Sequence, residues 1–373
     1  MVTRSRVPWT GVRHMRIAVV GAGLAGLAAG AALHRAGHEV QVFEQADGLR
    51  ASGLAINLWS NATSLLPAFG IPADRIPGEP FSRMVWRAAG REVTSTELPA
   101  RGLPHVNVQR AELLSALAAA LPADAISFGT RCSDVAALAS GHDLVVVADG
   151  ANSALRAAVT RPPRKQWTWT VWQATVTVEL PEVPKGAGAS VLRAGTFAGI
   201  WRLSGDRVTW FTEQPDRKPG DGRRVLEDLK HDQDPVLSRV AQATPEPDWV
   251  EWHARDLWPG RSLHRDNDVL VGDAAHAMLP TLGQGACQCL EDAAVLAAAV
   301  ADEDTLDQAL RRYEAARVPR VRRITALARA GAVTRRPSAA SRALPDALNA
   351  RLTALSGGPV LRRITRPVIT VPG

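Results

Sequence analysis

A glycine-rich turn near the N-terminus constrains the fold of this chain more than any other feature. Residues 15–46, MRIAVVGAGLAGLAAGAALHRAGHEVQVFEQA, begin with a short β-branched strand, continue into an Ala- and Leu-rich helix that ends near Gly37, and reach a second strand over 40–43. Glycines between such a strand and helix allow a tight turn, close approach of a pyrophosphate and close helix packing, and the helix N-terminus faces the anion. We therefore predict a dinucleotide-binding unit. Its turn consists of Gly21, Ala22, Gly23 and Gly26.

An acidic residue ends the second predicted strand. Glu44, followed by Gln45, stands where a carboxylate can accept hydrogen bonds from both hydroxyls of an adenosine ribose. An acid in this place, with no arginine beside it, favours an unphosphorylated ribose. The pattern predicts FAD or NAD as the bound dinucleotide, and it disfavours NADP.

A second loop of similar character lies far along the chain. The apolar segment DVLVGDAAHAMLP contains Asp273 at the end of a predicted strand, and the glycine loop GQGACQ and a helix over about 290–300 follow. A strand-end acid with a glycine loop at a helix N-terminus repeats the logic of the first motif at a different spacing. We expect this second loop to hold the sugar-alcohol and ring end of a long cofactor whose pyrophosphate lies at the first.

The region between the two motifs has a different pattern. Over 166–264, segments of alternating polarity are separated by Pro, Gly and Asp turns, which predicts an antiparallel sheet. The region is rich in tryptophan, and a sheet with many indole rings can form the wall of a pocket for a flat apolar ligand. We predict that Trp172 and Trp210 line the substrate pocket; the alternative is that both rings belong to the core.

Three ordered motifs resemble a known family. DGANSALR at 149–156 and GDAAHAMLPTLGQGACQCLEDA at 272–293, together with GAGLAG at 21–26 and Glu44, resemble the single-component flavin-dependent hydroxylases of the para-hydroxybenzoate hydroxylase type, over about 15–323. The resemblance implies an α/β fold in which a glutathione-reductase-type, Rossmann-like FAD domain is interrupted by an antiparallel-sheet substrate domain, with helices at the C-terminus. It also implies reduction of FAD by NADPH or NADH, capture of O2 as a flavin hydroperoxide, and transfer of one oxygen atom to an aromatic or other electron-rich substrate.

The resemblance also implies roles for individual residues. Asp273 would hold the ribityl hydroxyls, Asp149 would serve FAD and the reduced nicotinamide, and Cys132 would lie where backbone groups hold the adenine. Two arginines, Arg50 and Arg110, would lie near the flavin. The backbone against the flavin ring would come from Gly283, Gly285, Ala286 and Cys287.

Some positions depart from the family pattern. The family often has Asn where this chain has Cys287, so the flavin contact there is expected to be made by the backbone or to be altered. Tyr313 is the only tyrosine and falls in a C-terminal helix, so a pocket tyrosine that orients a phenol is not expected. His276 has no second ligand at metal spacing, so no metal site is predicted. Because the sequence has one glycine motif, we expect the reduced nicotinamide to dock transiently at the surface. We assign no residue as a catalytic acid or base.

Charge and cysteine content limit the partners and the compartment. The net charge of +7 is concentrated in an arginine-rich stretch over 311–373, in which only Glu314 and Asp346 are acidic. Because these arginines lack aromatic interleaving, we expect a solvated helical face, with one or two arginines reaching a cofactor pyrophosphate, and no nucleic-acid partner. Three cysteines fit a reducing compartment, the cytoplasm. No apolar run could span a membrane, and the basic residues 1–14 lack the apolar segment of a secretory signal.

Taken together, the motifs predict an FAD-dependent monooxygenase that is a monomer or homodimer. Two alternatives stay open: an FAD-dependent reductase or cyclase that acts on an isoprenoid or polyketide without oxygenation, and a basic protein whose arginine-rich end contacts nucleic acid. The predicted domains are an FAD-binding domain over 1–70, 105–165 and 265–330, a substrate domain over 71–104 and 166–264, and a C-terminal helical segment over 331–373.

Overall fold

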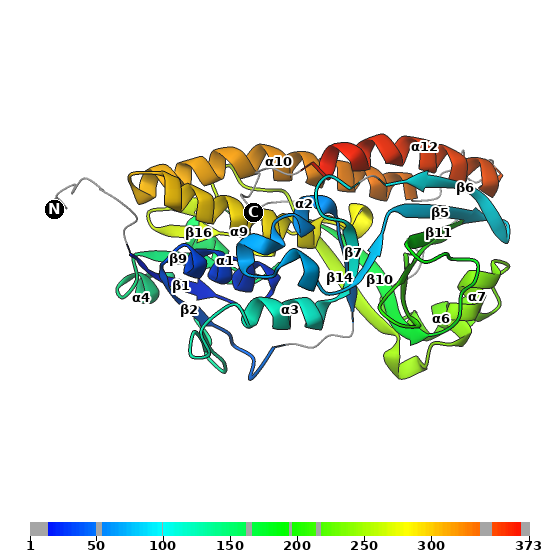
Figure 1. The fold of residues 1–373 in the computed structure, drawn as a ribbon, viewed down its shortest axis with the longest axis horizontal. Helices are drawn as coiled ribbons and strands as arrows, with labels where there is room; N and C mark the ends of the chain where they lie inside the picture. The colour runs from blue at the N-terminus through cyan, green and yellow to red at the C-terminus, as the bar shows by residue number, and fades with distance from the viewer. Residues whose placement is uncertain are drawn as a thin grey trace.

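Figure 1 shows the fold in a computed structural model, which describes residues 14–49, 54–98, 100–161, 166–193, 196–213, 218–335 and 345–366. Of the basic residues 1–14 the structure describes only His14, and Arg50 also lies outside the described residues. The predicted C-terminal segment over 331–373 is described only in part, at 331–335 and 345–366.

The first sheet is organised around the strand that precedes the N-terminal glycine turn. In order across the sheet, its strands are β15 (His264–Arg265), β16 (Asp268–Leu270), β9 (Leu144–Val147), β1 (Arg16–Val20), β2 (Glu39–Phe43) and β8 (Ile126–Ser127). All neighbouring pairs are parallel except β15 with β16. The central strands β1 and β9 are buried almost throughout, as expected for a parallel sheet that is covered on both faces.

Alanine-rich helices pack closely around this sheet. α1 (Leu24–Arg35) lies against α9 (Gly285–Asp302) and α3 (Arg110–Ala118), and small residues along α1 permit that approach. The helix expected over about 290–300 is longer at both ends. It begins at Gly285, which was expected in the loop, and it ends at Asp302. α10 (Leu306–Arg335) packs on α9, and its Tyr313 hydroxyl donates a 2.9 Å hydrogen bond to the Leu270 carbonyl.

The second sheet has seven strands and contains the tryptophan-rich region. In order across the sheet they are β14 (Val250–Leu257), β10 (Gln166–Thr177), β13 (Arg207–Glu213), β12 (Thr196–Arg202), β11 (Ala187–Arg193), β5 (Arg83–Ala88) and β6 (Arg91–Glu97). Neighbours are antiparallel except β11 with β5. The expected antiparallel sheet is therefore present, and two strands from the earlier part of the chain extend it at one edge.

The two faces of the second sheet have different coverings. α6 (Gly222–Lys230) and α7 (Pro235–Gln242) each bury an apolar stripe against one face, where a separate hydrophobic core forms. α12 (Asp346–Ile364) contacts β5, β6 and β11, and in Figure 1 it continues the line of α10 along the upper edge of the molecule.

A small third sheet is linked to the second by the hydrogen bonds of Asn107 with Arg202 and of Gln173 with Ala55. It consists of β3 (Ala55–Leu58), β7 (His105–Gln109) and β4 (Glu79–Phe81). Short helices complete the described chain: α2 (Ser60–Thr63), α4 (Val135–Ala139), α5 (Arg156–Val159), α8 (Asp273–His276), η1 (Leu66–Phe69), η2 (Ala73–Arg75), η3 (Glu246–Asp248) and η4 (Pro280–Leu282). The predicted combination of a parallel sheet with helices, an interrupting sheet and C-terminal helices is confirmed.

Candidate active site

The N-terminal glycine turn is shaped by contacts that exclude side chains at two positions and leave one position open. Gly21 has φ of +104° and donates a 2.7 Å hydrogen bond to the Phe43 carbonyl. A Cβ on Gly26 would lie 1.9 Å from the Gly21 carbonyl oxygen, so α1 packs on the turn only without one. A Cβ on Gly23 would meet no atom of the described residues within 4 Å. This part of the chain leaves the space beside Gly23 open for a ligand at the N-terminus of α1.

Glu44 fixes the turn to the end of β2. Its two carboxylate oxygens accept hydrogen bonds from the backbone N–H of Ala22 at 2.8 Å and of Ala46 at 2.9 Å. A carboxylate oxygen can accept two hydrogen bonds, so each oxygen keeps capacity for a ribose hydroxyl. The neighbouring Gln45 is exposed.

The segment that contains Cys132 lies beside the end of β2. Thr130 N–H donates to the Glu44 carbonyl at 2.8 Å, and Gly129 N–H donates to the Ala46 carbonyl at 3.0 Å. Burial raises the pKa of the half-buried Cys132 thiol. The segment is thus positioned next to Glu44, where the adenine end of a dinucleotide was predicted.

The loop after β9 joins the first motif region to the second. One carboxylate oxygen of Asp149 accepts hydrogen bonds from the N–H groups of Ala154 at 3.0 Å and Leu155 at 3.3 Å, which closes the turn before α5. Arg156, which sequence reasoning did not single out although it ends the DGANSALR motif, donates through Nε to the Ala274 carbonyl at 2.6 Å and through Nη2 to the Ala151 carbonyl at 2.9 Å. It therefore ties the Asp149 loop to α8.

Asp273 begins α8 and faces a cavity. Its side chain is exposed there, although the residue lies deep in the molecule. Burial raises the pKa of Asp273, and attraction to His276, Arg110 and Arg156 opposes that rise. The preceding Gly272 has φ of +58°, and a Cβ on it would lie 2.5 Å from the Ala25 Cβ of α1, so the close packing of this turn on α1 requires glycine.

The glycine loop before α9 forms a second part of the cavity wall. Gly283, Gly285 and Ala286 line the cavity, as does Arg110 at the start of α3. Cys287 is fully buried and turned away: its sulfur accepts a 3.4 Å hydrogen bond from the Trp59 backbone N–H, and burial raises its pKa to about 12. The Cys287 side chain therefore has no place in the cavity wall.

A buried network of charged side chains supports the Asp273 turn. Asp292 on α9 accepts hydrogen bonds from Gly272 N–H at 2.7 Å, His276 Nε2 at 2.6 Å and Arg317 Nε at 2.6 Å. Burial alone would raise the pKa of Asp292, but attraction to His276 and Arg317 and the hydrogen bonds from His276 and Gly272 lower it to about 2. The carboxylate thus stays ionised and holds the turn in place.

The network continues through the next acid of α9. Glu291 accepts hydrogen bonds from Arg317 Nη1 at 2.6 Å and Asn61 Nδ2 at 2.7 Å, and it also pairs with Arg320. Sequence reasoning missed these partners. The signal was the acidic pair in LEDA at 290–293, but nothing local shows which arginine of an arginine-rich helix reaches it.

Four further arginines of α10 have partners within the protein. Arg311 pairs with Asp307, Arg312 with Asp302 and Glu303, and Arg329 with Asp256. Arg322 donates to the Gly260 carbonyl at 2.9 Å. Much of the basic charge of this region is therefore used to hold α10 on the fold.

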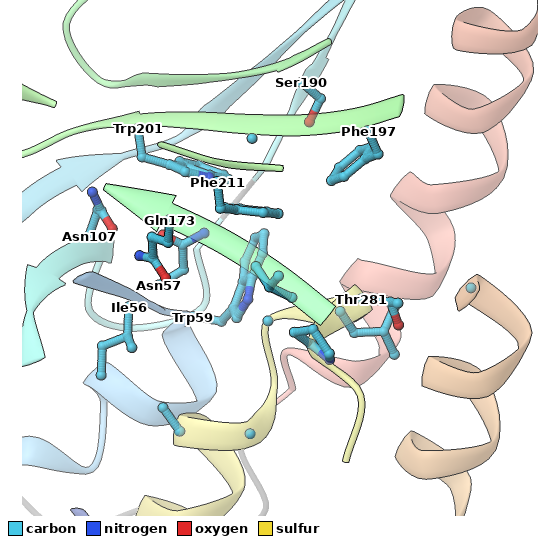
Figure 2. Close-up of a pocket in the computed structure, with 18 of the residues that line it drawn as sticks. Ile56, Asn57, Trp59, Asn107, Gln173, Ser190, Phe197, Trp201, Phe211 and Thr281 are labelled. Atoms are coloured by element: carbon cyan, nitrogen blue, oxygen red, sulfur yellow. The ribbon is translucent and has the colours of Figure 1, made fainter. Parts of the chain in front are cut away.

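The cavity has a volume of about 610 Å³ and is lined by Asp273 and by the face of the second sheet opposite α6 and α7, here called the inner face. Figure 2 labels several of the lining residues. Leu24, which directly follows Gly23, lines it, so the first glycine turn adjoins its wall. Its lining is largely apolar. From the second sheet come Val171, Gln173, Ser190, Phe197, Trp201, Thr209 and Phe211; from the small sheet Ile56, Asn57 and Asn107; from α10 and α12 Leu327, Gly331, Asn349, Thr353, Gly357 and Val360.

The prediction that Trp172 and Trp210 line this pocket is wrong. Both rings are fully buried in the core under α6 and α7, where Trp210 stacks on Trp249 at a centroid distance of 4.5 Å and Trp172 Nε1 donates to Glu251 at 3.0 Å. Successive side chains of a strand point to opposite faces. The cavity side of the sheet therefore carries their neighbours, Val171, Gln173, Thr209 and Phe211.

The described residues contain neither a metal-binding cluster nor a membrane-spanning helix. No group of three or more His, Cys, Asp or Glu side chains among them is arranged to hold a metal ion. Within the same ranges, none of the helices combines the length and apolar character that crossing a bilayer requires.

Comparison with known proteins identifies the family to which the chain belongs. Residues 141–328 match the family model described as "FAD binding domain", and residues 19–56 match "NAD(P)-binding Rossmann-like domain". The FAD-dependent urate hydroxylase of Klebsiella pneumoniae subsp. pneumoniae is 30% identical, with 84% of this chain and 89% of that protein covered. The chain belongs to the FAD-dependent aromatic hydroxylases. The 3-amino-4-hydroxybenzoate 2-monooxygenase of Streptomyces cremeus is 31% identical, with 85% and 86% covered.

A solved structure extends this relationship to the fold. The Klebsiella pneumoniae HpxO structure, complexed with FAD and uric acid, superposes with a TM-score of 0.82 at 25% identity and covers 97% of this chain and 98% of that one. The protein is thus an FAD-dependent monooxygenase that uses NADPH or NADH and O2 to oxygenate an aromatic or other electron-rich small molecule. These relatives support oxygenation and do not support the alternative of a reductase or cyclase.

Proposed function

We propose that the cavity is the oxygenation site, with the flavin ring at its Asp273 end and the substrate against the inner face of the second sheet. One observation carries this proposal: a single apolar cavity joins Asp273, Arg110 and the N-terminus of α9 to Gln173 and Phe211. Flavin and substrate need adjacent places from which water is excluded, and a continuous apolar cavity supplies them.

The residues present fit FAD. No atom of the described residues occupies the space beside Gly23 where a pyrophosphate would lie, and Glu44 retains acceptor capacity for the ribose. Asp273 faces the cavity as an acceptor for ribityl hydroxyls, and Arg110 lines the same region. We assign the other predicted contacts to Gly21, Ala22, Gly26, Gln45, Cys132, Asp149, Gly283, Gly285, Ala286 and the Cys287 backbone.

Bound FAD would supply the redox chemistry, taking a hydride from the reduced nicotinamide and activating O2 for transfer of one oxygen atom. The chain's own contribution is to bind, orient and exclude water. Phe211 and Trp201 offer apolar ring faces to a flat substrate, while Asp273 and Arg110 fix the position of the flavin against it. With a single glycine motif in the sequence, the nicotinamide docks transiently at the surface.

We also propose the organisation of the chain around this site. The FAD-binding domain comprises 1–70, 105–165 and 265–330, the substrate domain 71–104 and 166–264, and the C-terminal segment 331–373. The cysteines Cys132, Cys287 and Cys289 are free thiols, which supports the cytoplasm as the location. A monomer or a homodimer is proposed, and sedimentation analysis distinguishes the two.

The proposed role of Asp273 in binding FAD can be tested by substitution. Asp273→Ala should bind FAD about 10- to 100-fold more weakly while folding normally, because it loses charge-assisted hydrogen bonds worth about 1.5–3 kcal/mol each. FAD titration of the apoprotein by fluorescence measures this affinity. Asp302→Ala, at the exposed opposite end of α9, is the matched control and should bind FAD normally. Unchanged FAD affinity in Asp273→Ala would show that the cofactor is held elsewhere.

A further inference from the structure

Two buried amide side chains in the cavity wall have their orientation fixed by the backbone. Asn107 Nδ2 donates a 2.8 Å hydrogen bond to the Arg202 carbonyl, and Gln173 Nε2 donates a 3.0 Å hydrogen bond to the Ala55 carbonyl. A carbonyl can only accept, so the NH2 group of each amide must point toward it. Each side-chain oxygen is therefore turned away from the carbonyl that holds its own amide.

The side-chain oxygen of Asn107 is left without a hydrogen-bond partner among the described residues. Asn107 is 1% exposed, and this oxygen, Oδ1, is buried. Asn57 lies directly opposite Asn107 in the β3–β7 pair, and Figure 2 shows Asn57, Asn107 and Gln173 grouped at one end of the cavity. A buried acceptor without a donor costs free energy, so this end of the cavity is suited to receive a donor.

The cavity wall has few charged side chains. Among the described residues that line the cavity, the charged ones are Arg110 and Asp273, and the proposed function assigns both to the flavin. A carboxylate placed near Asn107 and Gln173 would meet amide oxygens and would lose its hydration without a cation to replace it.

We infer that the substrate is an uncharged aromatic compound whose ring hydroxyl or ring N–H donates a hydrogen bond to the side-chain oxygens of Asn107 and Gln173, and that aromatic carboxylates are excluded. This inference rests on the proposed function, because it takes the cavity as the substrate site. Hydroxyl and amino substituents also donate electron density to a ring, which suits an electron-rich substrate.

A purely structural role for these amides makes a different prediction. Asn107 links β7 to β12, and Gln173 links β10 to β3, so both could serve only to hold the sheets together. In that case, removing an amide would weaken every ligand by the same factor. Recognition of a donor would instead weaken only the ligand that carries the donor.

The first experiment compares three ligands of one ring system with the FAD-loaded enzyme at pH 7: 2-naphthol, 2-methoxynaphthalene and 2-naphthoate. Flavin absorbance changes give each dissociation constant. We expect 2-naphthol to bind about 3- to 10-fold more tightly than the methyl ether, which lacks the donor, and 2-naphthoate to bind at least 100-fold more weakly than 2-naphthol. Equal binding of naphthol and ether, binding of naphthoate as tight as naphthol, or no binding of any of the three would overturn the inference.

The second experiment combines these ligands with a variant. Gln173→Met keeps the length of the side chain and removes its amide, and it should raise the dissociation constant of 2-naphthol about 3- to 10-fold while leaving that of the methyl ether unchanged. Gln109→Met is the matched control, because Gln109 is similarly buried (9% exposed against 7%) but does not line the cavity. An equal loss for both ligands, or no loss for either, contradicts the inference.

The two proposals can fail separately. Quenching of tryptophan fluorescence reports ligand binding without flavin, since Trp59 and Trp201 line the cavity. Absence of FAD binding would refute the proposed function, and the ligand ranking would still be measurable. Normal FAD binding with the reverse ligand ranking would refute only the substrate class.

Discussion

Asp292 shows how one residue can make the stability of this protein depend on pH. Its pKa in the folded protein is about 2, below the usual 3.8, after the opposing effects of burial and of His276 and Arg317. The folded state therefore binds fewer protons than the unfolded state between these values, and the stabilisation is complete above about pH 4 and lost as pH falls toward 2.

We predict that this acid sensitivity depends on Asp292. Asp292→Asn should be destabilised at pH 7 by about 3–5 kcal/mol, because Arg317 keeps its buried charge without this partner. The difference in unfolding free energy between the unaltered protein and the variant should shrink from pH 4 to pH 2, as measured by urea unfolding. Asp307→Asn, in an exposed pair with Arg311, is the control and should change stability by less than about 1 kcal/mol. A difference that stays constant with pH would contradict the account.

The two faces of strand β13 have different roles. Trp210 belongs to the core on one face, and the adjacent Phe211 lines the cavity on the other. Trp210→Ala should lower the unfolding free energy by about 3–5 kcal/mol, because the ring is fully buried and its Nε1 donates to Thr244 at 2.9 Å. Substrate affinity in the folded fraction should not change. Phe211→Ala should instead weaken substrate binding, since this ring lines the cavity. Urea unfolding and ligand titration of both variants measure the two effects, and the opposite assignment would place the pocket on the α6–α7 side.

Helix α12 forms part of the cavity wall. Gly357 lines the cavity, and a Cβ there would meet no atom of the described part of the chain within 4 Å. Gly357→Ala should raise stability by about 0.5–1 kcal/mol, since glycine is unfavourable inside a helix. Gly357→Leu should fill this end of the cavity and weaken binding of 4-octylphenol about tenfold while leaving phenol unaffected. Ligand titrations of the Ala and Leu variants decide this; equal losses for both phenols would mean that α12 does not bound the substrate site.

For the molecule as a whole, local motifs were predictable from the sequence and long-range packing was not. The first glycine turn follows from spacing within a dozen residues, because Gly21 and Gly26 contact each other. The prediction that Trp172 and Trp210 point into the pocket was wrong. Alternation along a strand shows which residues share a face, but it does not show which face α6 and α7 cover.

The amide group of the cavity could not have been predicted from the sequence. Asn57 and Asn107 come from paired strands and Gln173 from the second sheet, and only the folded chain places them in one wall. The buried pairs of Asp292 and Glu291 with Arg317 were hidden for a similar reason, since several arginines of α10 have equivalent local surroundings in the sequence.

The measurement that tests the central claim most directly is isotope incorporation from oxygen gas. The FAD-loaded protein, supplied with NADPH or NADH and 2-naphthol under 18O2, should yield a product that gains one labelled oxygen atom by mass spectrometry. The same reaction in 18O-labelled water under ordinary O2 should yield unlabelled product. Turnover without gain of oxygen, or label that comes from water, would contradict the assignment of this cavity as a flavin-dependent oxygenation site.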